Sequence, residues 1–386
     1  MITSLQLLNF KPFANQLLEF KKLTLFSGLN STGKSSVMQS LLLLRQSYQQ
    51  GLLPEKGLAL NGDFVNVGTA RDALFEGAKE DLISFDIVWE NNSEGLWRFK
   101  YDQEVDVLNI VSEPVTSEVY KSNLFSNNFH YLQAERIGPR PFNEMSDYQV
   151  RQLGQLGIKG EYAAHFLAIN GRKVIPNSSL SHREVKSKTL RNEEQSTAKS
   201  MDLIDQVEAW MGEVSPGTRL KIDAKSDVDM MSFQYSYGDS NPYRATNVGF
   251  GISYTLPIIV AALASTPGTI ILIENPEAHL HPKGQVKMGQ LLALAASGGV
   301  QVVIETHSDH VLNGIRLAVH GGKIDPKDVR LHYFHRDNKE KERQAVTEVI
   351  SPKIDRNGRI DRWPEGFFDE WDNSLEILLE PAVEGE

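Results

Sequence analysis

The stretch GLNSTGKSS, residues 28–36, constrains the fold of this 386-residue chain more than any other feature. It matches the pattern G-x-x-x-x-G-K-[ST], which binds phosphates where a strand turns into a helix. The flanking sequence fits this context, because the apolar run Leu23–Phe26 precedes it and an apolar stripe at helical spacing follows it. A phosphate loop between a strand and a helix predicts an α/β fold with a largely parallel sheet.

Each residue type in the loop has a chemical reason to be there. Gly28 and Gly33 let the backbone N–H groups turn toward an anion, and the start of the following helix adds partial positive charge. We expect Lys34 to contact the β- and γ-phosphates of a nucleotide and the Ser35 hydroxyl to bind Mg²⁺. The other candidate nucleotide contacts in the loop are Asn30, Ser31, Thr32 and Ser36. ATP is the predicted nucleotide, since the one near match to a guanine-binding N-K-x-D motif, NKEK at 338–341, lacks the aspartate.

Two later runs, GTIILIE and GVQVVIET, are almost wholly apolar, which is typical of parallel strands covered by helices on both faces. The segment between them, residues 283–299, has the pattern of a crossover helix. Ligands of such sheets lie beyond the carboxyl ends of the strands. We therefore expect Glu274, after the first run, to hold Mg²⁺, and His307, after the second, to reach a γ-phosphate.

A second anion-binding element precedes the Glu274 strand, in the sequence ATNVGFGISYTLP. It lies at the start of an apolar helix, where exposed N–H groups favour a bound anion. Its candidate contacts are Asn247, Gly249, Gly251 and Ser253. A subunit with a complete phosphate loop does not need a second site for the same nucleotide, so we predict that this segment acts across a dimer.

Composition excludes several classes of protein. The chain has no cysteine, which excludes disulfides and thiol chemistry. Its net charge of −10 argues against non-specific coating of nucleic acid, although residues 183–191 and Arg172 form a local basic cluster that we expect to be solvated. The first residues lack a signal-peptide pattern, and the longest apolar run, Pro257–Ala264, is too short to span a membrane. We therefore expect a cytoplasmic protein without a membrane partner.

The sequence predicts four segments. Residues 1–110 and 241–320 form the two parts of the core, and residues 111–240 form an inserted α+β lobe containing the strand NFHYLQAE and a helix near AKSMDLIDQVEAWMGEV. Residues 321–386 carry a hairpin, KIDRNGRIDRW, with a two-residue Asn-Gly turn, and then an amphipathic helix. The residues expected to cap the core from this helix are Phe367, Phe368, Trp371, Leu375 and Leu378.

The order of these motifs, from GLNSTGKSS through NVGFGISYTLP and IILIENPEAHLHP to VVIETHSDHVLNGIR, resembles the ABC-type ATPases of the SMC and recombination-repair group. It resembles more closely the compact bacterial AAA-family ATPases of that group, such as the ATPase of Septu anti-phage systems and the ATPase domain of overcoming-lysogenization-defect nucleases. The resemblance, specific over residues 1–50 and 240–320, implies an ABC-type P-loop ATPase fold with a mainly parallel core sheet flanked by helices. It also implies a homodimer with two Mg²⁺-bound ATP molecules between phosphate loop and opposing signature segment.

By motif position in that group, residues 247–253 are the signature segment, Glu274 is the Walker B acid and His307 is the switch histidine. Gln133 takes the place of a Q-loop residue that would also bind the Mg²⁺.

The acid pair of the group is altered in this chain, because Asn275 stands where a second acid usually follows Glu274. An amide can position water but cannot accept its proton. Glu277 is the nearest alternative base, and an equal alternative is that it orders the loop with His279 or His281. A zinc site built on these two histidines is disfavoured, since no third imidazole or thiol is nearby. We expect slow hydrolysis.

The implied function is a nucleotide-dependent switch or scaffold that controls a separate effector in anti-phage defence, with an HNH-type nuclease favoured and nucleic acid bound through the complex. The sequence carries no long coiled coil and no acidic Toprim pattern. Dimers could assemble into a higher oligomer. Two alternatives stay open: a stand-alone DNA-repair or DNA-remodelling ATPase, and a non-hydrolysing ATP-sensing scaffold.

Overall fold

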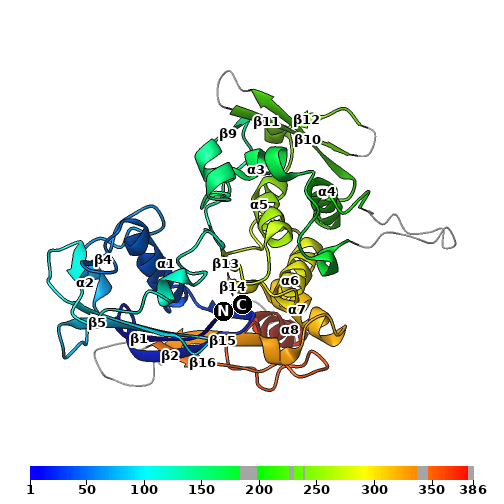
Figure 1. The fold of residues 1–386 in the computed structure, drawn as a ribbon. Coiled ribbons are helices and arrows are strands. Elements are labelled where there is room, and N and C mark those ends of the chain that lie inside the picture. The colour runs from blue at the N-terminus through cyan, green and yellow to red at the C-terminus, as the bar shows by residue number, and fades with distance from the viewer. Residues whose placement is uncertain (183–197, 226–229, 238–239, 337–346, 381–386) are drawn as a thin grey trace, which may run out of the picture.

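The computed structural model describes residues 1–182, 198–225, 230–237, 240–336 and 347–380. Its central sheet has six strands in the order β16-β15-β3-β14-β13-β8 (Figure 1). These are β3 (Leu23–Gly28), β8 (Phe129–Leu132), β13 (Ile270–Glu274), β14 (Gln301–Glu305), β15 (Val329–Arg336) and β16 (Thr347–Ile350). All neighbouring strands pair in parallel except β15 and β16. The predicted α/β fold with a mainly parallel core is thus confirmed.

Helices cover both faces of this sheet, which explains the continuous apolar strand sequences. Along β13, Ile271 and Ile273 pack into one core cluster while Ile270 and Leu272 pack into the other, because successive side chains point to opposite faces. The first cluster includes α5 (Phe250–Ala264), α6 (Pro282–Ser297) and α7 (Asp309–His320), and the second includes α1 (Lys34–Gln49). Helix α6 is the predicted crossover between β13 and β14.

An antiparallel sheet in the order β2-β1-β5-β6 packs on the α1 side of the core (Figure 1). Its strands are β1 (Ile2–Phe10), β2 (Phe13–Glu19), β5 (Leu82–Trp89) and β6 (Glu94–Lys100). Nearby lie the pair β4 (Gly57–Ala59) and β7 (Val107–Asn109) and the short helix α2 (Ala70–Ala73). The turn between β1 and β2 carries Lys11 and Pro12 to the phosphate loop, since a Cβ on Gly33 would lie 2.6 Å from Pro12 Cγ.

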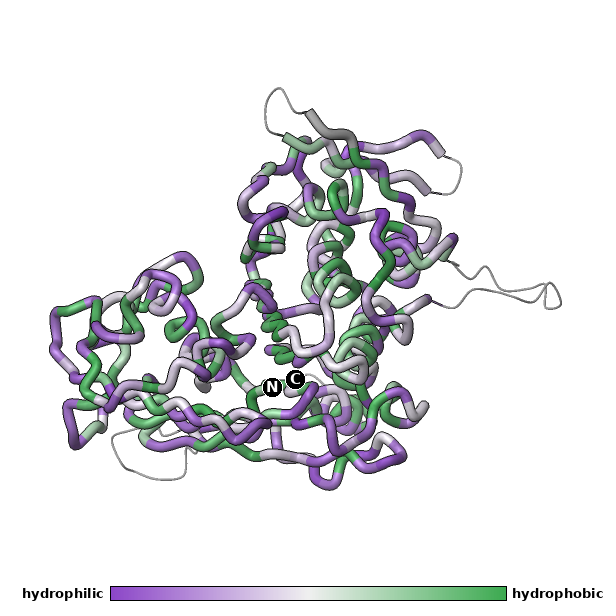
Figure 2. Tube along the Cα trace, in the orientation of Figure 1, coloured by the Kyte–Doolittle hydropathy of each residue, from purple (hydrophilic) through white to green (hydrophobic). Residues whose placement is uncertain are grey.

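The inserted lobe rises on the other side of the molecule around α5 (Figure 1). It contains α3 (Ala163–Asn170), α4 (Leu203–Val214) and a small sheet of β9 (Phe142–Glu144), β10 (Thr218–Lys225), β11 (Met230–Tyr237) and β12 (Tyr243–Arg244). Figure 2 shows α5 as apolar along most of its length, in keeping with a helix buried on several sides.

The strand predicted within the inserted lobe was misplaced. That strand, β8, pairs with β13 and forms the edge of the core sheet, and all four of its residues are buried. The chain therefore leaves the core for the lobe only after β8. The basic cluster at 183–191 and the NKEK stretch lie outside the described residues.

The C-terminal segment also differs from its prediction. Phe367 is fully buried, but it precedes helix α8 (Glu370–Leu379), on which Trp371 is 71% and Leu378 78% exposed. Phe367 and Phe368 pack on the core as expected. The expectation was wrong for Trp371, Leu375 and Leu378, because an apolar stripe indicates a face to be covered but not what covers it. The hairpin has one bridge, Ile354 with Ile360. Inside it the Asp355 N–H donates to the Arg359 carbonyl at 2.8 Å, so the loop has three residues, 356–358, rather than the predicted two. Among the described residues, no helix has the length and apolar character needed to cross a membrane.

Candidate functional site

The phosphate loop lies at the carboxyl end of β3, where it leads into α1. Only glycine fits at position 28, because φ is 137° and a Cβ would lie 2.1 Å from the Phe334 carbonyl oxygen. Lys34 Nζ donates to the carbonyl oxygens of Gly28 at 2.9 Å and Leu29 at 2.8 Å. The ammonium group is therefore fixed inside the loop, with burial lowering the pKa of Lys34 and Glu305 partly opposing that shift.

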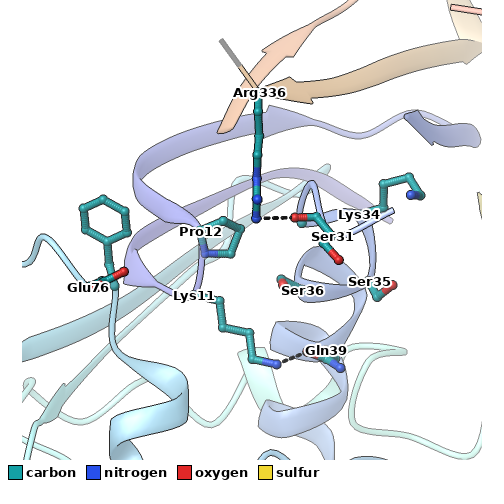
Figure 3. Close-up of a pocket in the computed structure, with 11 residues that line it drawn as sticks. Lys11, Pro12, Ser31, Lys34, Ser35, Ser36, Gln39, Glu76 and Arg336 are labelled. Carbon is teal, nitrogen blue, oxygen red and sulfur yellow. Dashed lines mark hydrogen bonds between the residues drawn. The ribbon is translucent and has the colours of Figure 1, made fainter. Parts of the chain in front are cut away.

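A cavity of about 370 Å³ opens beside the loop (Figure 3). Loop residues, the β1–β2 turn, α1, the segment after α2 and the end of β15 line it: Lys11, Pro12, Ser31, Gly33, Lys34, Ser35, Ser36, Gln39, Phe75, Glu76 and Arg336. Arg336 donates to the Ser31 carbonyl at 2.7 Å, and Lys11 Nζ to Gln39 Oε1 at 2.6 Å. The volume lies in the range of roughly 300–1,000 Å³ that small-molecule sites occupy.

The remaining loop residues predicted to contact the nucleotide differ in their surroundings. Asn30 is exposed, whereas the Thr32 hydroxyl is turned inward and donates to the Leu29 carbonyl at 2.8 Å. Ser31 has a left-handed backbone with φ 63°. Thr32 thus stabilises the loop from within, and the other side chains face the cavity or solvent.

Two carboxylates meet beside Ser35. Strands β13 and β14 are paired in register, so Glu274 lies opposite Glu305. Ser35 Oγ donates to Glu305 Oε1 at 2.9 Å, while Glu305 Oε2 is buried without a hydrogen-bond partner among the described residues. Burial, together with the charge of Glu274, raises the pKa of Glu305 from 4.5 to about 7. Because Glu305 Oε2 has no hydrogen-bond partner among the described residues, the pair of acids and the serine hydroxyl fit a hard divalent cation.

Glu305 was not among the predicted site residues. A usable signal was present, because Glu305 ends its apolar strand as Glu274 ends the other, and neighbouring parallel strands bring their carboxyl ends together. The sequence singled out the histidine two residues further on instead.

Glu274 is held from the end of β8. Its Oε1 accepts from the Tyr131 hydroxyl at 2.9 Å and its Oε2 from the Ala134 N–H at 3.0 Å. Burial and the Glu274 charge raise the pKa of Tyr131, so this phenol stays a donor. Gln133 lies between these two residues in the chain, yet its side-chain amide donates to the Glu135 carbonyl at 3.0 Å.

A buried arginine that sequence analysis missed fixes the backbone of the loop between β13 and α6, called the acid loop below. Arg136 is 2% exposed and donates to the carbonyl oxygens of Glu274 at 2.6 Å and Asn275 at 2.7 Å. It also donates to the Tyr254 carbonyl at 3.1 Å on α5. Asn275 has φ 44°, a conformation that asparagine tolerates better than most residues. Arg136 therefore connects the loop after β13 to helix α5.

Glu277 contacts Thr306 and His307 after β14, here called the switch segment because it carries the predicted switch histidine. Its Oε2 accepts from Thr306 Oγ1 at 2.7 Å and its Oε1 from the His307 N–H at 2.9 Å. These partners differ from the two histidines considered in the sequence. Burial and Lys34 lower the pKa of His307, against the opposing effect of Glu277, so the ring is neutral near pH 7. Glu277 thus orders the switch segment in this state, and its carboxylate lies next to the predicted switch histidine.

His279 and His281 have structural contacts of their own. The His279 ring packs edge-on against Tyr254 with centroids 4.7 Å apart, and His281 Nδ1 accepts from the Lys283 N–H at 3.3 Å at the start of α6. Within the described ranges, no group of three His, Cys, Asp or Glu side chains is placed to bind a metal.

The predicted signature segment is divided between surface and interior. Asn247 and Gly249 are exposed, and Gly249 caps α5 without a side-chain hydrogen bond. Gly251 packs against the acid loop, since a Cβ there would lie 2.5 Å from the His279 carbonyl oxygen. Ser253 is 9% exposed and lies beside Tyr235 in the interior. The backbone at the helix start, not the Ser253 side chain, is therefore the part open to an anion.

Sequence comparison identifies the family. Residues 23–313, most of the chain, match the model described as "AAA domain, putative AbiEii toxin, Type IV TA system". The chain belongs to this AAA-domain family. Residues 324–378 of this AAA-domain protein also match a model described as "Protein of unknown function (DUF3696)". No curated protein matches its sequence.

Solved structures of SMC heads share the fold of this AAA-domain protein. One, "Crystal structure of the SmcHead bound to the C-winged helix domain of ScpA", is 14% identical with a TM-score of 0.52, over 92% of this chain and 98% of that one. Another is the "Smc head domain with an extended coiled coil bound to the C-terminal domain of ScpA derived from Pyrococcus furiosus". It is 12% identical with a TM-score of 0.50, over 98% and 99% of the two chains. The fold is therefore that of an SMC-like P-loop ATPase.

The titration of Glu305 gives a testable dependence of stability on pH. In Mg²⁺-free buffer, the folded protein holds a proton on Glu305 up to a pKa of about 7, whereas the unfolded chain loses it near 4.5. The contribution of Glu305 to the free energy of unfolding is therefore complete below about pH 4.5 and is lost as the pH rises through 7. We expect a loss of roughly 3 kcal/mol between about pH 5 and 8, at about 1.4 kcal/mol per pKa unit. Urea unfolding at several pH values measures it, and an unchanged slope in Glu305→Gln would show that another group is responsible.

Proposed function

We propose that this AAA-domain protein is a slowly hydrolysing ATPase that binds Mg²⁺ and ATP between two copies of itself and uses the bound state as a switch. The convergence of the phosphate loop with Ser35, Glu305 and Glu274 at one end of the sheet carries the proposal. Phosphate release from ATP by purified protein, with and without Mg²⁺, tests it. No release above the level of a phosphate-loop variant would leave only the scaffold alternative.

In this proposal some residues of one subunit bind the phosphates and others bind Mg²⁺. Lys34 exchanges its two loop carbonyls for phosphate oxygens, and the loop N–H groups bind the same anion. Ser35 and Glu305 would hold Mg²⁺, with Glu274 beside them, and the bound ion would offset negative charge on the phosphates. Gln133, predicted as a further ligand, would first have to release the Glu135 carbonyl.

Glu277 is our candidate to position or deprotonate the attacking water, since Asn275 cannot take a proton. Its contacts with Thr306 and His307 connect that role to the switch segment. A γ-phosphate that attracts His307 would pull on the same hydrogen bonds. The connected residues Glu277, Thr306 and His307 would therefore both respond to bound ATP and activate the water.

The dimer proposal is supported by the start of α5. A Cβ added at Gly249 would meet no heavy atom within 4 Å, and the neighbouring Phe250 is 55% exposed. The N–H groups at this helix start face outward and are not used by the phosphate loop of the same chain. A γ-phosphate presented by a second copy is the anion that fits this surface.

Control of a separate effector in anti-phage defence, as in Septu systems, is the finer part of the proposal. The family description names a toxin–antitoxin context, and the SMC heads named above are bound to a partner, ScpA. Helix α8 offers a surface for such a partner, with Trp371 and Leu378 exposed and Glu370, Asp372 and Glu376 around them. An HNH-type nuclease remains our favoured effector, and DNA would be bound through the complex.

Loss of this apolar surface should prevent binding of the partner without changing ATP turnover. We expect the double variant Trp371→Ser/Leu378→Ser to lose copurification with the product of the adjacent gene while its ATP turnover stays within about twofold of wild type. Leu17→Ser, which removes a leucine that is 62% exposed on β2, is the matched control. Equal copurification with the double variant would place the partner elsewhere.

The stand-alone DNA ATPase is the second candidate. It would depend on the basic cluster at 183–191, and the net charge of −10 disfavours it. Stimulation of ATP turnover by free DNA ends, lost when those basic residues are neutralised, would favour it over the switch.

A further inference from the structure

The C-terminal segment, here residues 324–379, brings a cation to the phosphate loop. This cation is Arg336, which ends β15, a strand that pairs in parallel with β3 so that Phe334 lies opposite Gly28. Phe334 packs in the core cluster that contains α1, and residues two apart on a strand point to the same face. Arg336 therefore extends toward the loop that precedes α1, and Figure 3 shows its side chain pointing at Ser31.

The guanidinium group of Arg336 has donors to offer a ligand. Arg336 is an exposed residue that donates to the Ser31 carbonyl at 2.7 Å and forms no ion pair with the residues that the structure describes. A guanidinium group carries five N–H donors in a planar fork, which matches phosphate oxygens. Arg336 can therefore bind a phosphate while it keeps its contact with Ser31.

The charges along the cavity beside the loop favour an anion. Its lining contains the cations Lys11, Lys34 and Arg336 and a single acid, Glu76. Each cation donates to an uncharged oxygen, and in the described part of the chain none of them has a carboxylate within ion-pair distance. A hydrogen bond from a cation to a phosphate is about twice as strong as one to a neutral acceptor, so a bound phosphate would improve on the present contacts.

Strand β15 also contacts the chain that leads into α8. The Tyr333 hydroxyl donates to the Glu365 carbonyl at 3.0 Å, and the Tyr333 ring packs edge-on against Phe367 with centroids 5.5 Å apart. Phe367 is fully buried and lies three residues before the first residue of α8. One strand thus contacts the phosphate loop through Arg336 and the base of the exposed helix through Tyr333.

We propose that Arg336 binds the triphosphate of ATP and that the C-terminal segment responds to the nucleotide through this contact. The inference rests on the proposed function, because it requires ATP at the phosphate loop. It adds to that function a phosphate ligand which belongs to the same segment as α8. The ATP site and the surface proposed for the partner are then joined by one strand.

Equilibrium dialysis of radiolabelled ATP with Mg²⁺ and the full chain tests the phosphate contact. Arg336→Gln removes the charge but keeps an amide donor for Ser31, whereas Arg336→Lys keeps the charge. We expect ATP to bind at least about tenfold more weakly to Arg336→Gln and within about threefold of wild type to Arg336→Lys. If Arg336 only supported the loop through Ser31, the two variants would bind ATP equally.

Hydrogen exchange of residues 365–379 tests the response of the C-terminal segment. In the wild type, saturating Mg²⁺ and ATP should slow exchange of these backbone N–H groups, because the contact of Arg336 with the phosphates restrains β15 and the chain packed on it. In Arg336→Gln, at an ATP concentration that saturates this variant, the exchange should stay as it is without nucleotide.

The control is Arg362→Gln, which neutralises an exposed arginine of the same segment that does not line the cavity. It should keep the wild-type affinity and the wild-type exchange response, and thermal unfolding verifies that each variant folds. A wild type that binds no ATP would contradict the proposed function itself. With ATP bound to the wild type, the inference alone is overturned if Arg336→Gln binds ATP as tightly as Arg362→Gln or Arg336→Lys does, or if ATP has the same effect on exchange in Arg336→Gln as in the wild type.

Discussion

Replacing Lys34 with alanine should greatly weaken ATP binding and lower ATP turnover with it. Lys34 Nζ already lies within 2.9 Å of two loop carbonyl oxygens, so its ammonium group is placed to donate to phosphate oxygens bound in the loop. Each hydrogen bond to a charged group contributes about 1.5–3 kcal/mol, so losing two should weaken binding by a factor on the order of 100 or more. Equilibrium dialysis with radiolabelled ATP measures the change.

The matched control is Lys11→Ala, at the other end of the same cavity. The Lys11 ammonium group donates a hydrogen bond to Gln39 rather than to the phosphate loop, so we expect a smaller loss of ATP affinity than for Lys34→Ala. Wild-type affinity in Lys34→Ala, with an unchanged unfolding temperature, would mean that ATP does not bind at the phosphate loop.

Glu277→Gln should lower ATP turnover by about 100-fold or more while ATP still binds, since general-base catalysis contributes about 10²–10⁴-fold. The amide can keep both contacts, accepting from the His307 N–H and donating to Thr306 Oγ1. The variant therefore removes the basic carboxylate and preserves the order of the switch segment. Phosphate release under saturating ATP measures the effect.

Two further variants distinguish the role of Glu305 and of position 275 from that of Glu277. Glu305→Gln keeps the hydrogen bond with Ser35 but removes a charge, so it should raise the Mg²⁺ concentration needed for turnover. Asn275→Asp restores a second acid at a φ of 44° that aspartate tolerates, and we expect it to raise turnover. Unchanged turnover in Glu277→Gln would assign Glu277 to ordering the switch segment only.

The parts of the site that could be predicted from sequence are those encoded by local patterns. The phosphate loop, the strands before Glu274 and His307, the crossover helix and the helix that follows Gly249 all carry their signal within a few residues. Motif spacing and apolar periodicity are sufficient for such elements. Their convergence followed from the rule that parallel strands bring their carboxyl ends to one edge.

Glu305 carried a local signal, as the acid that ends its apolar strand, but its contact with Ser35 and the role of Arg136 depend on which parts of the chain are neighbours. Glu305 contacts Ser35 only since β14 lies between β3 and β13. Arg136 acts through backbone carbonyls on a loop and a helix that are more than a hundred residues away in the chain. The exposed face of α8 shows the same limit, since amphipathic spacing does not specify what covers the apolar side.

ATP-dependent dimerisation is the most direct test of the proposed switch. Light scattering should give a mass near that of the 43.3 kDa chain without nucleotide and about twice that value with Mg²⁺ and ATP. Glu277→Gln, which should bind ATP without hydrolysing it, should accumulate as the dimer. A mass that stays the same in that variant, while dialysis shows ATP bound, would contradict the proposal that ATP is held between two copies of this chain.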